Sequence, residues 1–166
     1  MGVSSCLLGE NVRYNGEIKL NTTVKFELGK AVCFVPVCPE TESGMPVPRE
    51  PMDLFQADGS IRMITLESRR DMTGVMEEWI EKKLSELVKL ELCGFVFKAR
   101  SPSCAVNSAL LHVESRPERN GEGLFAKAFI ERFPSLPVEE GEKLHDPVRR
   151  AVFLEKVYNI HRARHR

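Results

Sequence analysis

Three short apolar runs, each leading to a cysteine, constrain the fold of this chain more than any other feature of its sequence. The runs are residues 1–5, 31–37 and 93–97, and the cysteines that follow them are Cys6, Cys38 and Cys104. Short apolar runs bounded by turn residues are typical of buried strands. Ligands bind at the carboxyl ends of the strands in open α/β sheets. If these strands are neighbours in one parallel sheet, the sequence predicts that the three thiols converge.

The segment Lys98–Cys104 is the richest in functional groups. It reads Lys-Ala-Arg-Ser-Pro-Ser-Cys, and Pro102 disfavours both a continued strand and a helix. A cysteine is often only a small buried hydrophobe, and that interpretation suits Cys33 and Cys93, which lie inside apolar runs. We therefore expect these two to be buried and to play no part in a site.

The remaining patterns predict alternating strands and helices. Apolar residues at helical spacing and capping residues predict helices near residues 21–29, 71–92, 124–133 and from Asp146 onward. Asp58-Gly59 between two alternating runs predicts a hairpin over residues 52–66. Short strands are expected at 108–113 and 136–138, and irregular loops at 38–51 and 114–123. This order favours a mostly parallel α/β sheet.

Composition limits the classes of function. The chain has 166 residues with 24 basic and 24 acidic side chains, so its overall charge does not favour polyanion binding. No apolar run approaches the roughly 20 residues of a membrane span. Five cysteines, an odd number, favour metal or redox use over a disulfide framework. We expect a cytoplasmic protein without a membrane segment.

Several motifs together resemble those of the TudS-type thiouracil desulfurases. They are Ser4–Gly9, Arg13–Gly16, Val37–Glu40, Pro48-Arg49 and Lys98–Cys104. The resemblance implies a Rossmann-like or flavodoxin-like sheet with helices on both faces, and a catalytic domain over residues 1–120. Residues 121–166 would form a C-terminal helical extension similar to the junction with a second domain in longer tRNA thiouridine desulfidases. One position departs from the family pattern, because Ala105 stands where the family has glycine.

The resemblance also implies a [4Fe-4S] cluster bound by Cys6, Cys38 and Cys104, and a catalytic Glu–Ser pair that matches Glu40 and Ser101. Thiolates are the usual ligands of such clusters. Three of them leave one iron open to the sulfur of a substrate. Glu42 and Ser103 are the alternatives for the catalytic pair. The residues expected to bind substrate are Arg13, Arg49, Lys98, Arg100 and Ser103.

The predicted function is non-redox removal of sulfur from a thiolated uracil or uridine, which releases sulfide and the oxo base. The free base, the nucleoside and thiolated tRNA all present the same thiocarbonyl. Two alternatives remain open, a structural zinc module and an RNA-binding module without catalysis. The chain has no close Cys-x-x-Cys pair, which a zinc module would be expected to have. It also has no excess of basic residues, which would favour RNA binding.

Overall fold

The computed structural model describes residues 1–114 and 116–166. A parallel sheet, sheet A, contains β1 (Gly2–Ser4), β2 (Val35–Val37), β5 (Phe95–Phe97) and β8 (Val138–Glu140) in the order β2-β1-β5-β8. All of its strand pairs are parallel. This order is the flavodoxin-like one. The predicted α/β class is therefore confirmed, and the three runs that lead to the cysteines are neighbouring strands.

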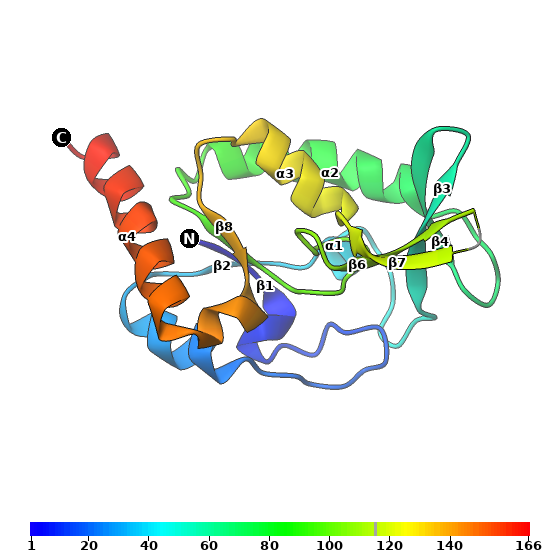
Figure 1. Ribbon diagram of the computed structural model, residues 1–166, viewed down its shortest axis with the longest axis horizontal. Coiled ribbons are helices and arrows are strands. Elements are labelled where there is room, and N and C mark those ends of the chain that lie inside the picture. Colours follow the sequence, from blue (N-terminus) through cyan, green and yellow to red (C-terminus); the bar gives the residue numbers. More distant parts are fainter. Residues whose placement is uncertain (115) are drawn as a thin grey trace.

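Helices cover both faces of sheet A (Figure 1). They are α1 (Pro39–Glu42), α2 (Thr73–Val88), α3 (Leu124–Arg132) and α4 (Pro147–Arg164), with short helical segments at Ser5–Leu8, Thr23–Glu27, Leu28–Lys30 and Gly141–His145. Phe95 and Phe97 pack with α2 and α3 on one face. Val3 and Val96 pack with α4 and the 23–30 segment on the other face. Alternate strand residues thus supply two cores.

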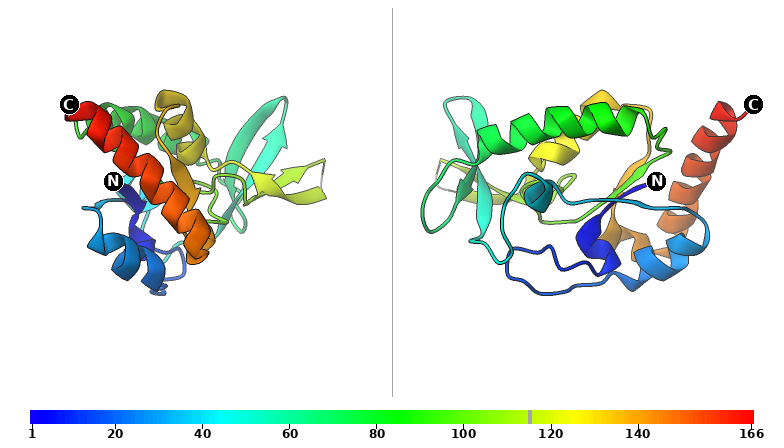
Figure 2. Two further views of the ribbon diagram at one scale, coloured as in Figure 1. Left: turned by 60° about the vertical axis from the view of Figure 1, so that its left-hand side comes forward. Right: turned by 180° about the vertical axis from the view of Figure 1, so that it is seen from behind.

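A second sheet, sheet B, was not predicted as a unit. It contains β3 (Met52–Ala57), β4 (Ser60–Thr65), β6 (Ala109–Val113) and β7 (Arg116–Gly121) in the order β4-β3-β6-β7. The Asp58-Gly59 hairpin is confirmed, and both turn residues have positive φ. The strand β7 corrects the expectation of a plain loop after residue 113, while Ser115 lies outside the described residues. Sheet B and α4 lie at opposite ends of the molecule (Figure 2).

Some predicted boundaries are wrong for local reasons. Helix α2 ends at Val88 rather than near Leu92, because Glu91 has a φ of 47°, which no helix continues. Strand β2 begins only at Val35, since Ala31 and Val32 still donate to Leu28 O. The 38–51 loop contains the one-turn helix α1. Within the described residues, no helix has both the length and the apolar character needed to cross a membrane.

Strand β8 connects the C-terminal region to the rest of the fold. It pairs with β5 over three residue pairs, so residues 138–140 belong to the same sheet as the strands before the cysteines. Helix α4 begins as predicted, with Asp146 accepting hydrogen bonds from Val148 N and Arg149 N. The division into residues 1–120 and 121–166 stays a prediction, but the sheet itself spans that boundary.

Candidate active site

The three predicted thiols line one cavity of about 520 Å³. Cys6 lies in the helical turn after β1, Cys38 directly follows β2, and Cys104 lies in the loop after β5. The chain leaves β1 toward β2 on one side and leaves β5 toward β8 on the other side, so the topological switch point of the sheet lies between β1 and β5. The parallel sheet thus brings together groups that are up to 98 residues apart in the sequence.

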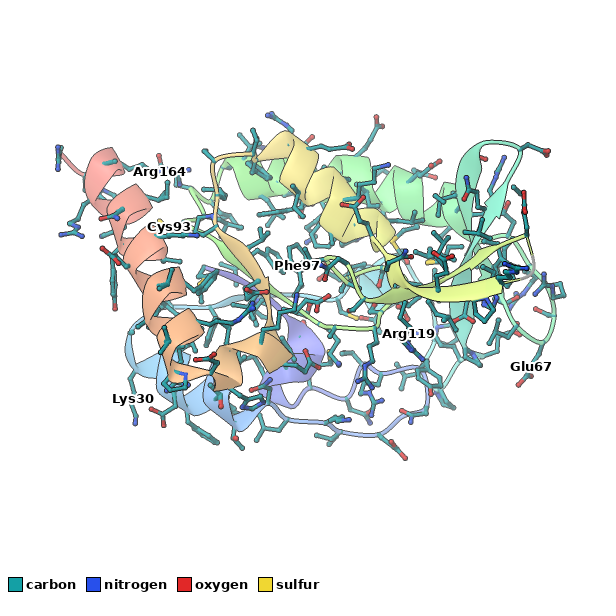
Figure 3. The ribbon with its side chains drawn as sticks, viewed as in Figure 1. Lys30, Glu67, Cys93, Phe97, Arg119 and Arg164 are labelled. Carbon is teal, nitrogen blue, oxygen red and sulfur yellow. The ribbon has the colours of Figure 1, made fainter. Side chains whose placement is uncertain are left out.

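All five cysteines are free. Cys33 is exposed and Cys93 is half-buried, so the expectation that both are buried is wrong. The reason is that β2 and β5 start after them, which leaves both residues in irregular segments outside the sheet. Cys93 lies beside Arg164, far along the molecule from Arg119, which lines the cavity (Figure 3). Neither Cys33 nor Cys93 lines that cavity.

Burial controls the protonation of the three cavity thiols. It raises the pKa of Cys6 to about 12, although the nearby charge of Lys98 opposes the shift. Burial likewise raises the pKa of Cys38 and, more strongly, that of Cys104. The charge of Cys38 raises the pKa of Cys6 further, and the charges of Cys6 and Cys38 do the same for Cys104. A metal centre bound here would replace the thiol protons.

The three thiols line one cavity. Across the described residues, no three His, Cys, Asp or Glu side chains converge as ligands of a single metal ion. Three thiols that line one cavity are the ligand type of a polynuclear iron–sulfur cluster, in which each thiolate binds its own iron. The chemistry and the placement of the donor set therefore fit such a cluster.

Glu40 lies on α1, two residues after Cys38, and is 8% exposed. Its Oε2 accepts a hydrogen bond from Arg49 Nε at 2.8 Å. Arg49 is itself fixed, because Nη2 donates to Val12 O at 2.8 Å and Nη1 donates to Pro46 O at 3.1 Å. The guanidinium of Arg49 therefore holds Glu40 in place, and its nitrogens are already engaged.

Glu42, the alternative acid, has a different environment. Its Oε1 accepts a hydrogen bond from Cys38 N at 2.9 Å, and its Oε2 lies 2.6 Å from Lys83 Nζ. Glu42 does not line the cavity, whereas Glu40 does. The structure therefore favours Glu40 as the acid that can meet a substrate.

A chain of hydroxyl groups leads to Glu40. Ser103 Oγ donates to Glu40 Oε1 at 2.9 Å, and Ser101 Oγ lies 3.0 Å from Ser103 Oγ. A carboxylate only accepts hydrogen bonds, so the single hydroxyl proton of Ser103 is used in its bond to Glu40. The hydroxyl of Ser101 is therefore the donor in the bond between the two serines. Ser101 Oγ also accepts from Ser103 N and from Cys104 N, at 3.2 and 3.1 Å. Both serines therefore belong to one network with Glu40.

The predicted basic residues all line the cavity, but they differ in their partners. Lys98 Nζ donates to Glu142 and to Ala99 O. Arg13 pairs with Glu17 at 3.3 Å. Among the described residues, the side chain of Arg100 has no ion-pair partner. Arg100 is thus the most available of these cations for a substrate.

Two acids that the sequence analysis missed support the site. Glu142 lines the cavity, and the hydrogen bond and charge of Lys98 outweigh burial and lower the pKa of this carboxyl group. Glu140 is 2% exposed and accepts hydrogen bonds from Val106 N, Asn107 N and Ser108 Oγ, which fixes the chain after Cys104. Both acids lie beyond residues 1–120, the predicted catalytic domain, so the sequence offered no reason to place them at the site.

Ala105 fits its position despite the departure from the family pattern. It is fully buried and is not among the residues with positive φ, so no glycine is required there. The close approach occurs instead at Gly123, where a Cβ would lie 2.5 Å from Ser103 C and 2.6 Å from Cys104 N. Gly123 N also donates to Ala105 O at 2.7 Å. Gly123 therefore supports the turn that carries Ser101, Ser103 and Cys104.

Gly123→Ala is expected to destabilise the protein by roughly 1–3 kcal/mol, because backbone atoms of Ser103 and Cys104 must move. Thermal unfolding measures this loss. Gly74→Ala in α2 is the matched control, since its Cβ meets no atom within 4 Å. An alanine in a helix is favoured over glycine, so the control should be neutral or slightly stabilising. Equal melting temperatures for both variants would contradict the role of Gly123.

Comparisons with known proteins agree with this geometry. The 2-thiouracil desulfurase family model matches residues 1–141. The uncharacterized protein YbbK of Bacillus subtilis (strain 168) is 31% identical over 108 residues, which are 61% of this chain and 70% of that protein. The solved structure of the [4Fe-4S]-dependent thiouracil desulfidase TudS has a TM-score of 0.70 and 28% identity, and the match covers 88% of this chain and 93% of TudS. The chain therefore belongs to the 2-thiouracil desulfurase family.

Proposed function

We propose that this protein is a [4Fe-4S]-dependent desulfurase that converts a thiolated uracil or uridine to the oxo base and releases sulfide. One observation carries the proposal: Cys6, Cys38 and Cys104 line the same cavity as Glu40 and Ser101. The similarity to TudS, a [4Fe-4S]-dependent thiouracil desulfidase, supports the cofactor.

Cys6, Cys38 and Cys104 would hold the cluster. When bound, the cluster supplies an iron without a protein thiolate, which attracts the soft sulfur of the substrate and acts as a Lewis acid. The overall reaction exchanges one C=S bond for one C=O bond by adding water and releasing hydrogen sulfide. No electron donor or acceptor is required.

Glu40 and the two serines manage the protons of this exchange. Glu40 is the general base that takes a proton from the attacking water, and the ion pair with Arg49 holds its carboxylate toward the cavity. Ser101 and Ser103 form a hydroxyl path from Glu40 along the loop of Cys104. This path can return a proton to the departing sulfur or to a ring nitrogen.

The basic residues bind the rest of the substrate. Arg13, Lys98 and Arg100 line the cavity and are suited to a uracil carbonyl or to a phosphate. Free thiouracil, thiouridine and thiolated tRNA are the candidate substrates. Arg49 contributes indirectly, by fixing Glu40.

The test is anaerobic reconstitution of the full chain with iron and sulfide. Iron and acid-labile sulfide are then measured per chain, together with sulfide release from thiouracil, thiouridine and thiolated tRNA. Iron with labile sulfide and turnover of any of these substrates supports the proposal. Bound zinc without iron, or RNA binding without metal, would favour the structural or RNA-binding alternative and overturn it.

The two remaining cysteines should be dispensable for the cofactor. Cys33→Ala and Cys93→Ala should keep full iron content, because neither residue lines the cavity. Since Cys33 is exposed, its replacement should also leave the melting temperature almost unchanged. Cys93 is half-buried, so its replacement removes some packing and should lower the melting temperature slightly more. Iron analysis and thermal unfolding measure both effects. Loss of iron from either variant would assign a different ligand set.

A further inference from the structure

Sheet B contributes a carboxylate to the cavity that the proposed reaction does not use. Asp53 on β3 and Leu110 on β6 both line the cavity. Leu54, the residue after Asp53 on β3, is instead fully buried in the core. Strand alternation therefore turns Asp53 away from the core. The thiols, Glu40 and the serines all come from segments that follow the strands of sheet A, so Asp53 belongs to a separate wall of the cavity.

His112 fixes the position of Asp53. Its Nε2 lies 2.8 Å from Asp53 Oδ2, and its ring stacks on Phe55 with a centroid distance of 4.3 Å and an angle of 9°. The guanidinium carbon of Arg69 lies 4.6 Å from the centroid of the same Phe55 ring. The pairing of Phe55 with His112 in the β3–β6 register sets this arrangement. A restrained imidazole thus holds one oxygen of the carboxylate.

The second oxygen of Asp53 is free for another donor. Among the described residues, Oδ1 has no hydrogen-bond partner, and Asp53 forms no ion pair with a lysine or an arginine. The side chain is 19% exposed, so this oxygen meets solvent rather than the core. An ionised carboxylate only accepts hydrogen bonds. The site therefore selects a ligand that presents an N–H or O–H group.

We propose that Asp53 is a specificity-determining residue whose Oδ1 accepts a hydrogen bond from the thiolated pyrimidine, and that His112 is its positioning residue. The donor is either the ring N–H or a ribose hydroxyl. This inference rests on the proposed desulfurase function. A polar site discriminates strongly against a ligand that leaves its buried groups unpaired.

The test measures binding of uracil and uridine to the reconstituted protein by isothermal titration calorimetry. Both probes keep the N3–H donor and lack sulfur, so no turnover interferes, and uracil alone also carries an N1–H donor. Asp53→Asn can retain the His112 bond through its amide oxygen, but it then turns an N–H group toward the donor of the ligand. The dissociation constant is expected to rise about 10- to 100-fold, the scale of a hydrogen bond to a charged group. Asp58→Asn, in the exposed β3–β4 turn, is the matched control.

His112 is tested by a pair of variants. His112→Phe keeps an aromatic ring against Phe55 but removes the N–H donor, so KM for the thiolated substrate should rise while kcat is retained. His112→Gln restores a side-chain N–H and should recover most of the lost affinity. If His112 only packs against Phe55, His112→Gln should weaken substrate binding more than His112→Phe, because Phe preserves the ring stack and Gln does not.

The outcomes separate the inference from the proposed function. Weaker binding of both probes to Asp53→Asn identifies the ring N3–H as the donor, weaker binding of uracil alone identifies N1–H, and weaker binding of uridine alone identifies the ribose. Unchanged affinity for both probes, or no binding of either probe to the unmodified protein, overturns the role of Asp53. If the unmodified protein binds a probe and Asp53→Asn weakens that binding, but no thiolated substrate releases sulfide, the desulfurase proposal fails while the role of Asp53 stands.

Discussion

Replacing Cys104 with serine is expected to remove both the bound iron and the release of sulfide. Cys104 is 5% exposed, lines the cavity and is contacted by the hydroxyl group of Ser103, so a substitution there acts directly on the proposed ligand set. A hydroxyl group is a much harder and weaker iron ligand than a thiolate. The brown colour, the iron content and the activity of the reconstituted protein should therefore disappear together. Iron analysis and visible absorption measure the loss.

The Cys93→Ala variant is the control for general damage, since Cys93 lies outside the cavity. Serine and cysteine have similar shapes, so Cys104→Ser should keep its fold, and circular dichroism of the unreconstituted protein checks this. A folded Cys104→Ser protein with a full complement of iron would remove Cys104 from the ligand set.

The second large effect is expected for Glu40→Gln. The cluster should assemble, because Cys38 and its hydrogen bond with Glu42 are unchanged. Turnover should fall by a factor of about 100 or more, the usual scale for a positioned general base. The melting temperature should also decrease, because the buried Arg49 loses its charged partner, at a cost of roughly 1–3 kcal/mol. Iron per chain and sulfide release are measured on the same sample.

Glu42→Gln, prepared in parallel, separates the two acids. Glu42 pairs with Lys83 outside the cavity, so this variant should retain most of its turnover. A fully loaded Glu40→Gln protein with undiminished turnover, together with an inactive Glu42→Gln protein, would transfer the general base to Glu42.

The arrangement of the cysteines could be predicted from the sequence because strands have a simple signature. The two thiols meet if the apolar runs before Cys6 and Cys38 form adjacent parallel strands. The structure shows this arrangement, because β1 and β2 pair in parallel. The αL turn at Asp58-Gly59 and the cap at Asp146 are likewise local signals, and the structure confirms both. Local chemistry therefore predicted most elements.

The network around Glu40 could not be predicted, because its partners come from distant parts of the chain. Nothing in the sequence near Ser103 or Arg49 reveals that both contact Glu40. The same holds for Glu142, which meets Lys98 across 44 residues of sequence. Strand β7 was missed because five of its six residues are exposed and none is a large apolar residue, so its formation depends on pairing with β6 rather than on a pattern of its own.

The separation of the cavity into two walls has an evolutionary consequence. Sheet B is built from two excursions of the chain, one between β2 and β5 and the other between β5 and β8. Mutations in the strands of sheet B can reshape the surface that meets a substrate, while Cys6, Cys38 and Cys104 stay on the segments that directly follow β1, β2 and β5. Related proteins can therefore diverge in the thiolated molecules that they accept while they inherit the same reactive centre.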